Sequence, residues 1–279
     1  MIETKQSESL VEASDAPMVS VLISCFNAED FIADAVASIL AQTLTDWELV
    51  VVDDGSTDAT LSQLDQFSDT RIRVVRSHEN MGISRALNIG LQFVHGRYIA
   101  RLDADDLASA CRLEKQVDYL EKNPRAVAVG GSLSVFGETS ESILARKPSD
   151  SLGPYFLRGN QYLSSSVMFR RECLQGRDIR FNETLPNAQD YDFWMQLSKY
   201  GNLAQVPGVL GQYRFHDSQE TSRNALRQRR LGLRVQSAAV MGRYDTLGVT
   251  WFDRLMGIVF LARHVGGYVR IKFSMKWVN

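Results

Sequence analysis

Buried strands and amphipathic helices alternate along the first hundred residues of the chain. Four runs predict strands, and the first two of them are typical of strands buried in the sheet, the first being a continuous β-branched run. These runs are residues 19–24, 47–53, 71–77 and 97–103. The stretches between them carry apolar residues at helical spacing, over residues 29–41, 57–67 and 83–94. Because strand and helix alternate through short connections, the pattern predicts an α/β fold with a mostly parallel central sheet flanked by helices.

The pattern is less regular in the second half of the chain. The expected elements there are helices over 112–120 and 188–201, strands over 126–136 and 209–216, and a strand leading into a helix over 164–174. These elements extend the domain that begins at residue 18 as far as residue 222. Residues 1–17 are polar and acidic, which predicts a disordered leader.

The distribution of charge sets the last part of the chain apart. The whole chain has 44% apolar and 23% charged residues and a formal net charge of -2, which is ordinary for a soluble globular protein and gives no sign of a nucleic-acid binder. From residue 221 onward, however, 11 Lys and Arg face only two Asp, a net charge of +9. Residues 223–279 are therefore predicted to form a basic, mainly helical C-terminal extension.

Two roles for this extension follow from its composition. It either packs on the domain or a neighbouring subunit, or attaches to anionic membrane lipids. Its apolar residues, among them Trp251, Phe252 and Ile258, do not follow one clean stripe along the sequence, unlike those of a typical interfacial helix. The composition alone favours neither role.

The cellular compartment is predicted from three further features. The cysteines, Cys25, Cys111 and Cys173, are too widely spaced for a metal-binding pattern or a disulfide framework, which fits a reducing compartment. The N-terminus has no apolar signal-peptide core. No stretch reaches the roughly 18 apolar residues that a membrane span needs. We therefore expect a cytoplasmic protein.

Five carboxylates follow two of the predicted strands. Asp53 and Asp54 end the second strand, and Asp103, Asp105 and Asp106 follow the fourth. Parallel strands end at the same edge of a sheet, where ligands bind, so these side chains should meet there and repel one another. Helix capping explains one carboxylate per helix but not five. Mn²⁺ or Mg²⁺, bound by one or two carboxylates together with substrate phosphates, would neutralise them. The cluster therefore predicts a site for a metal-bound diphosphate.

Other phosphate-binding and hydrolytic sites lack their motifs. The loop after the first strand, residues 25–30, contains no glycine, so the dinucleotide-binding fingerprint is missing. The chain has no Gly-rich loop ending in Gly-Lys-Ser/Thr and no Gly-x-Ser-x-Gly elbow. A P-loop phosphoryl transferase and a serine hydrolase are therefore disfavoured.

Segments of the chain resemble one known family. The matching segments, in order, are residues 19–60, 80–106 (ending in Asp103-Ala104-Asp105-Asp106), 166–174, 188–201 and 209–222. Together they resemble the family-two glycosyltransferases of the bacterial surface-polysaccharide type. The resemblance implies an inverting enzyme with the GT-A nucleotide-sugar transferase fold. It also implies a nucleotide-binding half over residues 18–110 and an acceptor-binding half over residues 111–222.

The resemblance implies roles for individual residues. Asp54 matches the position that reads the base, Asp103 lies near the ribose, and Phe26 stands where a Tyr is usual. The implied nucleotide-binding residues are Ser24, Phe26, Asp53, Asp54, Arg85 and Asp103. Asp105 matches the metal-bound Asp of the Asp-x-Asp motif, and His216 falls where some relatives supply a metal-ligating His. The implied cofactor is Mn²⁺ or Mg²⁺.

The implied catalytic base is Asp190. Gln189 departs from the family pattern, which has Glu before this Asp, and Ser164 stands where many relatives carry a His. Asp192 lies two residues further along the predicted helix and should face elsewhere, with a structural or acceptor-binding role. Asp190 is thus expected to take the proton of the acceptor hydroxyl as the sugar is displaced with inversion.

The expected reaction is the transfer of a hexose from a UDP- or dTDP-sugar to an acceptor hydroxyl in polysaccharide or glycolipid biosynthesis. The expected partners are the nucleotide-sugar donor and a saccharide or lipid-linked saccharide acceptor, with no nucleic acid. Peripheral contact with the inner face of the membrane, and a homo-oligomer, are left open. Two alternatives also remain: a catalytically inactive scaffold that binds a nucleotide sugar, and a nucleotidyltransferase, which would release pyrophosphate.

Overall fold

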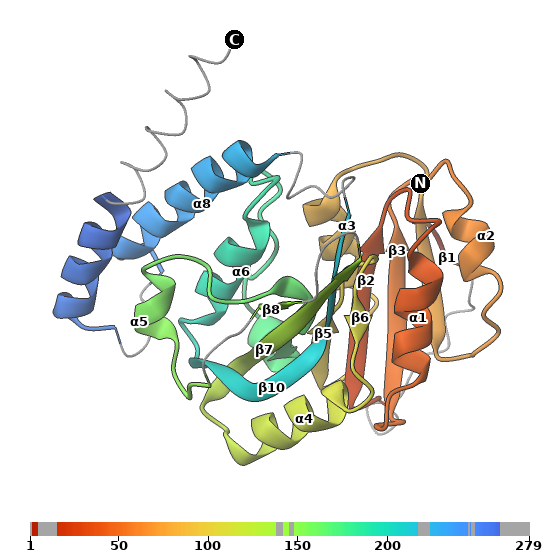
Figure 1. Ribbon diagram of the computed structural model, residues 1–279, viewed down its shortest axis with the longest axis horizontal. Helices are drawn as coiled ribbons and strands as arrows, with labels where there is room; N and C mark the ends of the chain where they lie inside the picture. The colour runs from red at the N-terminus through yellow and green to blue at the C-terminus, as the bar shows by residue number, and fades with distance from the viewer. Residues whose placement is uncertain are drawn as a thin grey trace, which may run out of the picture.

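Ten strands form one sheet at the centre of the molecule (Figure 1). The computed structural model describes residues 2–4, 16–137, 142–144, 148–216, 224–244, 246 and 249–262. The strands are β1 (Ile2–Thr4), β2 (Val19–Cys25), β3 (Trp47–Asp53), β4 (Ile72–Ser77), β5 (Tyr98–Arg101), β6 (Leu107–Ala108), β7 (Ala126–Gly137), β8 (Ser142–Leu144), β9 (Met168–Arg170) and β10 (Asn202–Phe215). Their order in the sheet is β1-β4-β3-β2-β5-β9-β7-β10-β6, and β8 pairs with β7.

The predicted parallel strands form the N-terminal half of this sheet. β4, β3, β2 and β5 are parallel neighbours in that order. Side chains on both faces of β2, β3 and β5 are buried, for example Val50 and Val51, as expected for strands between two layers of helices. Because parallel strands end at one edge, β3 and β5 bring Asp53 and Asp103 to the same side of the sheet.

The C-terminal half of the sheet is mixed, so the parallel order predicted from the sequence is limited to the N-terminal half. β9 is antiparallel to β5 and β7, and β6 is antiparallel to β10, whereas β7 and β10 are parallel. β9 directly follows a single 3-10 turn, η1 (Ser164–Ser166), and β6 is only two residues long. The α/β fold class is confirmed.

β10 begins at Asn202 rather than at residue 209. The prediction started late because Pro207 and Gly208 interrupt the apolar pattern. The strand continues through them by shifts of its register against β7 between Gln205 and Gly211, and Gly208 has a φ of 90° there. The longer strand carries the chain to His216 at its C-terminal end.

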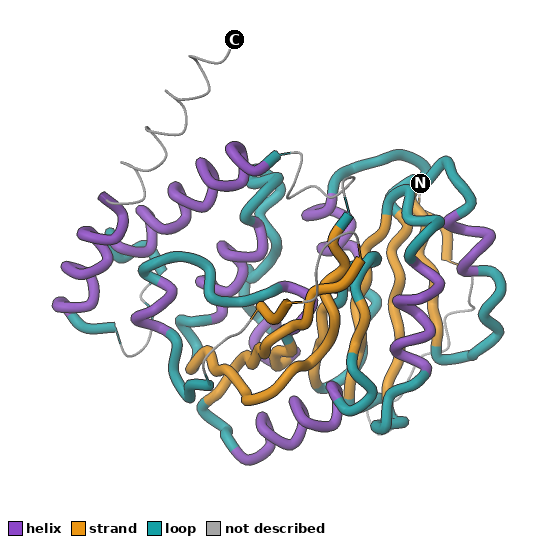
Figure 2. The backbone as a smooth tube through the Cα atoms, in the orientation of Figure 1, coloured by secondary structure: helices purple, strands orange, loops and turns teal. Residues whose placement is uncertain are grey.

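Helices cover both faces of the sheet (Figure 2). One face packs against α1 (Ile32–Leu40), α2 (Thr60–Leu64) and α4 (Arg112–Lys122). The other packs against α3 (Ile83–Gly90), α5 (Gly153–Phe156), α6 (Gln189–Leu197) and α8 (Ala225–Val240). A further helix covers residues 251–262. This two-sided arrangement leaves the edge at the ends of β3 and β5 to loops.

Segments near both ends of the chain pack on the central domain. Residues 2–4, expected in a disordered leader, form β1 and pair antiparallel with β4, which would otherwise be an unpaired edge strand. At the other end, α8 packs on α6 and buries Val235 and Tyr244 in the core of the domain. The expected boundary at residue 222 and residues 263–279 lie outside the described residues. Across the described chain, no helix is long and apolar enough to span a bilayer.

Candidate active site

The carboxylate of Asp53 lies at the end of β3. Its side chain is fully buried, and its Oδ1 accepts the N–H of Ser56 at 3.1 Å. Its Oδ2 accepts no hydrogen bond from a described residue and lies 3.8 Å from Nε of Arg76 on β4. Because this oxygen is enclosed by protein and faces Arg76, Asp53 supports the loop after β3 from within the fold.

Asp54 holds the loop that leads into α3. Its two carboxylate oxygens accept the backbone N–H groups of Met81 at 2.9 Å and Gly82 at 2.8 Å. Burial raises the pKa of Asp54, while these two N–H groups and the positive charge of Arg85 act in the opposite direction. Arg85 is itself exposed on α3. The sequence placed these residues at one site, and the structure brings Asp54 and Arg85 into electrostatic contact.

Ser24 and Phe26 lie at the end of β2, on the same edge of the sheet. The Phe26 ring is 45% exposed. The next residue, Asn27, has a φ of 50°, donates its N–H to Oγ of Ser56 and accepts the N–H of Thr57 at its side-chain oxygen. These hydrogen bonds join the loops after β2 and β3, so the backbone next to the exposed Phe26 ring is held in place.

Asp103 is held by two donors. Arg101 donates to its Oδ1 at 2.5 Å, and the hydroxyl of Ser165 donates to its Oδ2 at 2.9 Å. Arg101 is buried under the carboxylates, and Arg112, also buried, donates to the backbone carbonyl of Arg101 at 2.6 Å. Burial and the nearby charge of Arg101 lower the pKa of Arg112 to about 9. Two buried arginines thus offset part of the negative charge above them.

Asp105 and His216 are in direct contact, although 111 residues separate them in the sequence. Nε2 of His216 lies 3.1 Å from Oδ2 of Asp105. Burial raises the pKa of Asp105, and the charge of Asp103 raises it further. The His216 ring packs against Phe31, with ring centroids 4.4 Å apart. The sequence proposed both residues as metal ligands, and the structure brings them together.

The backbone around this pair is held by Asp106 and Arg214. Oδ1 of the buried Asp106 accepts the N–H of Arg214 at 2.9 Å, and the Arg214 guanidinium donates to the carbonyl of Asp105 at 2.9 Å. The pKa of Asp106 is raised well above its ordinary value, by burial first and then by its two acidic neighbours, Asp105 and Asp103. Neither role was predicted, because hydrogen bonds between distant backbone segments leave no local sequence signal.

The residues present fit a metal site with two protein ligands. The described chain contains no group of three or more His, Cys, Asp or Glu side chains that could hold a metal ion. Asp105 and His216 offer two donors, and buried carboxylates with raised pKa values gain from a neighbouring cation. Two protein ligands completed by phosphate oxygens are the way divalent ions are held in many nucleotide sites.

Asp190 lies in the first turn of α6. Its Oδ2 accepts hydrogen bonds from Asn160 at 2.9 Å and from the Ser164 hydroxyl at 3.0 Å, and its Oδ1 accepts the N–H of Tyr191 at 2.7 Å. Burial raises the pKa of Asp190, and the charge of Asp103 adds to the increase. A carboxylate that is more basic than an exposed one suits proton abstraction.

The chain makes an unusual turn just before Asp190. Ala188 has a φ of 118° and a ψ of 13°, the left-handed conformation that non-glycine residues seldom adopt. Oε1 of Gln189 accepts the N–H of Ala188 at 3.0 Å. Gln189, which stands where the family pattern has Glu, therefore stabilises this turn. Backbone strain of this kind concentrates at functional sites.

Two adjacent serines connect the halves of the site. Ser164 donates to Asp190 and Ser165 donates to Asp103, both from η1. In the sequence, Ser164 stands out only as a departure from the family pattern, and Ser165 was not predicted as a site residue. The available signal was the run of three serines at residues 164–166, directly before an apolar strand.

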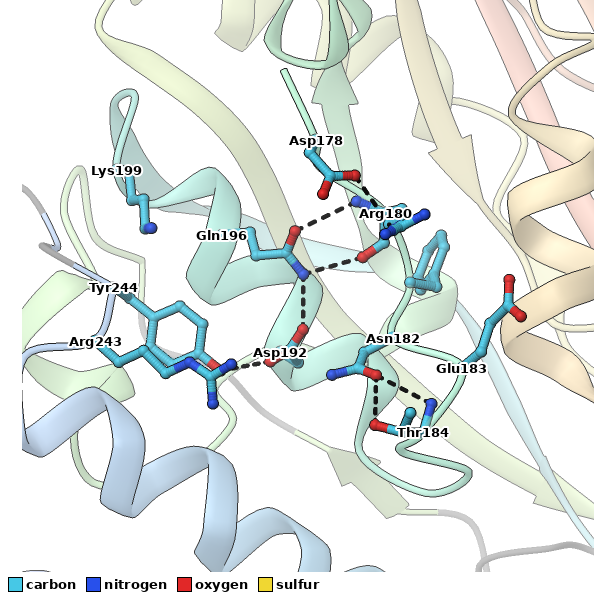
Figure 3. A pocket seen from close by; sticks show the side chains of 11 residues that line it. Asp178, Arg180, Asn182, Glu183, Thr184, Asp192, Gln196, Lys199, Arg243 and Tyr244 are labelled. Atoms are coloured by element: carbon cyan, nitrogen blue, oxygen red, sulfur yellow. Dashed lines mark hydrogen bonds and ion pairs between the residues drawn. The ribbon is translucent and has the colours of Figure 1, made fainter.

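Asp192 faces a different region of the molecule. It accepts hydrogen bonds from the Tyr244 hydroxyl and, at 2.7 Å, from Gln196, which also bonds the backbone of Arg180 (Figure 3). These residues line a pocket of about 520 Å³ to which Asp190 does not contribute. Asp192 therefore ties α6 to the extension and to the loop at Arg180, in line with the structural role expected for it.

Comparison with known proteins identifies relatives of the chain. An uncharacterised glycosyltransferase of Haemophilus influenzae is 36% identical over 221 residues, covering 75% of this chain and 68% of the relative. A second relative, from Escherichia coli, is 29% identical and covers 75% of this chain and 81% of its own length. Its name gives its activity as a UDP-Glc:alpha-D-GlcNAc-diphosphoundecaprenol beta-1,3-glucosyltransferase.

Solved structures share the fold. A crystal structure of Staphylococcus aureus TarS with UDP-GlcNAc superposes with a TM-score of 0.71 at 18% identity, over 88% of this chain and 71% of that one. The mannosyltransferase PcManGT of Pyrobaculum calidifontis, solved with GDP-Man and Mn²⁺, has a TM-score of 0.66 at 18% identity, over 95% of this chain and 79% of that one. The fold is thus the GT-A fold of glycosyltransferases.

A family model covers more than half of the chain. The model described as Glycosyl transferase family 2 matches residues 20–185, which include the carboxylates after β3 and β5. Asp190 and His216 follow the end of this match. With the fold, the edge of carboxylates and relatives that are themselves glycosyltransferases, the match places the chain plainly: it belongs to glycosyl transferase family 2.

Proposed function

We propose that the chain transfers a hexose from a UDP- or dTDP-sugar to an acceptor hydroxyl, with inversion at the anomeric carbon. The observation that carries this proposal is the link through η1, in which Ser164 bonds Asp190 and Ser165 bonds Asp103. One short turn thereby fixes a basic carboxylate relative to the Asp-x-Asp segment. Such positioning of a base beside a bound donor is what a single displacement requires.

The donor would bind along the ends of β2, β3 and β5. The exposed Phe26 ring can stack on the base, and Ser24 lies next to it. Asp53 would support this pocket from within the fold, through its hydrogen bond to the backbone of Ser56. Asp54, whose oxygens already accept two backbone N–H groups, would shape the wall of this pocket, and a direct contact with the base stays a prediction. Asp103 would lie at the ribose and Arg85 near the diphosphate.

Asp105 and His216 would hold Mn²⁺ or Mg²⁺ on the diphosphate. The 3.1 Å contact between their donor atoms supports this assignment, as does the Mn²⁺ bound in the PcManGT structure. When bound, the ion would supply Lewis-acid stabilisation of the charge on the departing nucleoside diphosphate. The hydrogen bonds of Arg214 to Asp106 and to the Asp105 carbonyl would hold the two metal ligands close to each other.

Asp190 would accept the proton of the attacking hydroxyl. Its three hydrogen-bond donors hold both oxygens in place, and Asn160 and Ser164 reach it from outside α6. The proton passes from the acceptor oxygen to the carboxylate as the new glycosidic bond forms and the bond to the nucleotide breaks. The anomeric carbon is attacked from the side opposite the leaving group, which inverts it.

The acceptor is proposed to be a saccharide carried on a lipid, in the synthesis of a surface polysaccharide. The named activity of the Escherichia coli relative, which acts on a GlcNAc-diphospholipid, supports this class. An acceptor of that kind places the enzyme in the cytoplasm at the inner face of the membrane, with peripheral contact through the C-terminal extension.

The test replaces Asp190 by Asn, which keeps the size and removes the proton acceptor. Turnover is measured as UDP released from UDP-glucose with a synthetic GlcNAc-diphospholipid, and donor binding by calorimetry in the presence of Mn²⁺. A positioned base contributes about 10²–10⁴-fold, so we expect turnover to fall by that order while donor affinity is kept.

Asp192→Asn is the matched control on the same helix. Because Asp192 accepts bonds from Tyr244 and Gln196, we expect this change to lower stability by about 1–3 kcal/mol and to leave turnover of the folded protein nearly intact. Near-normal turnover in Asp190→Asn with unchanged donor affinity would show that Asp190 is not the base.

A further inference from the structure

The helix over residues 251–262 presents a wholly apolar face to solvent. Its exposed side chains are Trp251 (75%), Phe252 (61%), Leu255 (41%), Ile258 (50%) and Val259 (42%), and Ala262 is exposed as well. At about 100° per residue these six positions lie within an arc of about 120°. The exposed apolar residues of this helix therefore form one stripe. The stripe was not predicted from the sequence, because other apolar residues of the helix lie on its inner face.

The inner face of this helix is fixed to the protein. Arg254 points inward and donates to the carbonyls of Ala239 and Val240 at the end of α8. Gly257 is buried so closely that a Cβ there would lie 2.9 Å from the Val240 side chain. Asp253 accepts the N–H and hydroxyl of Thr250, which closes the start of the helix. The outward arc is consequently a defined surface.

Basic residues accompany this apolar face. α8 runs from the middle of the molecule to the end farthest from α2, where its last turn meets the 251–262 helix (Figure 1), and its first ten residues expose Arg227, Arg230 and Arg234. Their spacing of three and four residues places them on one side of α8. None of the three forms an ion pair or side-chain hydrogen bond with a described residue. The sequence that follows, residues 263–279, adds four Lys and Arg and no acidic residue.

We propose that this end of the molecule docks on an anionic lipid bilayer, with the 251–262 face inserted among the acyl chains and the α8 arginines at the headgroups. Tryptophan and phenylalanine on an exposed apolar stripe, with arginines exposed on the helix that packs beside it, match the chemistry of the bilayer interface. Three arginines without an acidic partner in the described chain favour an anionic surface over a second copy of this chain. The proposal shares its membrane setting with the proposed function but does not depend on the reaction.

The experiment measures sedimentation of the full-length protein with vesicles. One set contains phosphatidylglycerol and phosphatidylethanolamine, and the other contains phosphatidylcholine alone. We expect binding to the anionic set only, and weaker binding as salt screens the charges. Replacing Arg227, Arg230 and Arg234 by Gln should weaken binding on the order of 100-fold, since each basic residue near an anionic surface contributes about fivefold.

The apolar face is tested by a second variant, Trp251→Gln with Leu255→Gln and Ile258→Gln. All three side chains are exposed, so the fold should persist, and binding to anionic vesicles should be lost. The charge control replaces Lys115, Lys122 and Arg125, which are exposed at and after α4. The apolar control is Ile143→Gln on β8, a side chain that is 59% exposed. Both controls should bind as the wild type does.

Three results would overturn the proposal. The first is a wild-type protein that does not bind anionic vesicles at low salt. The second is equal binding by the Trp251 variant. The third is a change from dimer to monomer in that variant, measured by light scattering without lipid, because it would assign the face to a second copy. UDP release with a water-soluble GlcNAc acceptor should be unchanged in every variant, so failure of docking can be told apart from failure of the proposed chemistry.

Discussion

The environment of Asp190 determines the pH at which the proposed base can act. Its folded-state pKa is raised by burial and by Asp103, and partly lowered by the donors Tyr191, Ser164 and Asn160. Only the ionised form accepts a proton. Turnover should therefore fall as the pH drops through this raised pKa, at a higher pH than the value of about 3.9 for an exposed Asp. Ionisation also costs folding stability as the pH rises through the same pKa.

Replacing Ser164 tests this pH dependence of turnover. Ser164→Ala removes a donor to the ionised carboxylate, which raises the pKa of Asp190 further. We expect the acid limb of the kcat profile to move upward by on the order of one pH unit. Ser198→Ala is the matched control, because Ser198 donates to the Met195 carbonyl near the other end of α6 and touches no carboxylate. If the two profiles coincide, Ser164 has no part in setting the basicity of Asp190.

Some residues of the candidate site could be predicted from the sequence and others could not. The carboxylates after β3 and β5 could be predicted, because their positions follow from strand order alone. Arg101 and Arg112 were not, because arginine is seldom fully buried, whereas both are buried beneath the site. Their burial depends on carbonyl acceptors in distant segments, such as Leu22 for Arg101.

At the scale of elements, the predictions succeeded where periodicity is regular. β2 and β3 carry nearly continuous apolar runs, and each of the parallel strands β2 to β5 was predicted within a few residues. β6 and β9 have two and three residues, too few for any period to show. β10 was predicted only in part, because a bulge at Pro207 and Gly208 breaks its pattern without ending the strand.

Close packing of α3 on the sheet gives a prediction for this element. A Cβ at Gly90 would lie 2.4 Å from the Leu22 side chain and 2.9 Å from that of Val52, so α3 can approach β2 and β3 only with glycine there. Gly90→Ala should destabilise the protein by about 1–3 kcal/mol. Gly232→Ala is the control within α8, where a Cβ meets nothing within 4 Å. It should stabilise the protein by about 0.5–1 kcal/mol.

Urea unfolding of the two glycine variants measures both effects. Since Asp54 bonds the backbone just before α3, a displaced helix should also reduce donor affinity in Gly90→Ala and leave it unchanged in Gly232→Ala. Equal stabilities for Gly90→Ala and the wild type would mean that α3 can shift on the sheet at little cost.

At the scale of the whole molecule, the fold gathers negative charge that it only partly compensates. Asp54, Asp105, Asp106 and Asp190 all have raised pKa values, with burial as the main cause. Neighbouring carboxylates raise these pKa values further, because Asp103 acts on Asp105, Asp106 and Asp190, and Asp53 acts on Asp54. A cation that binds alone has only two protein ligands, Asp105 and His216. A diphosphate that binds alone is repelled by the carboxylates. Each ligand should therefore bind better in the presence of the other.

This coupling is measurable as thermal stabilisation. A ligand at about 100 times its dissociation constant stabilises the folded state by about 2.7 kcal/mol, a rise in the unfolding midpoint on the order of 5 °C for a chain of this length. We expect such a rise with UDP and Mn²⁺ together, and a much smaller one with either alone or with UDP in EDTA. Asp105→Ala should lose the joint effect, because it removes one of two donors to the ion. Asp118→Ala, an exposed residue on α4, should keep it. A full shift with UDP in EDTA would mean that the diphosphate needs no cation, and the metal assignment to Asp105 and His216 would fail.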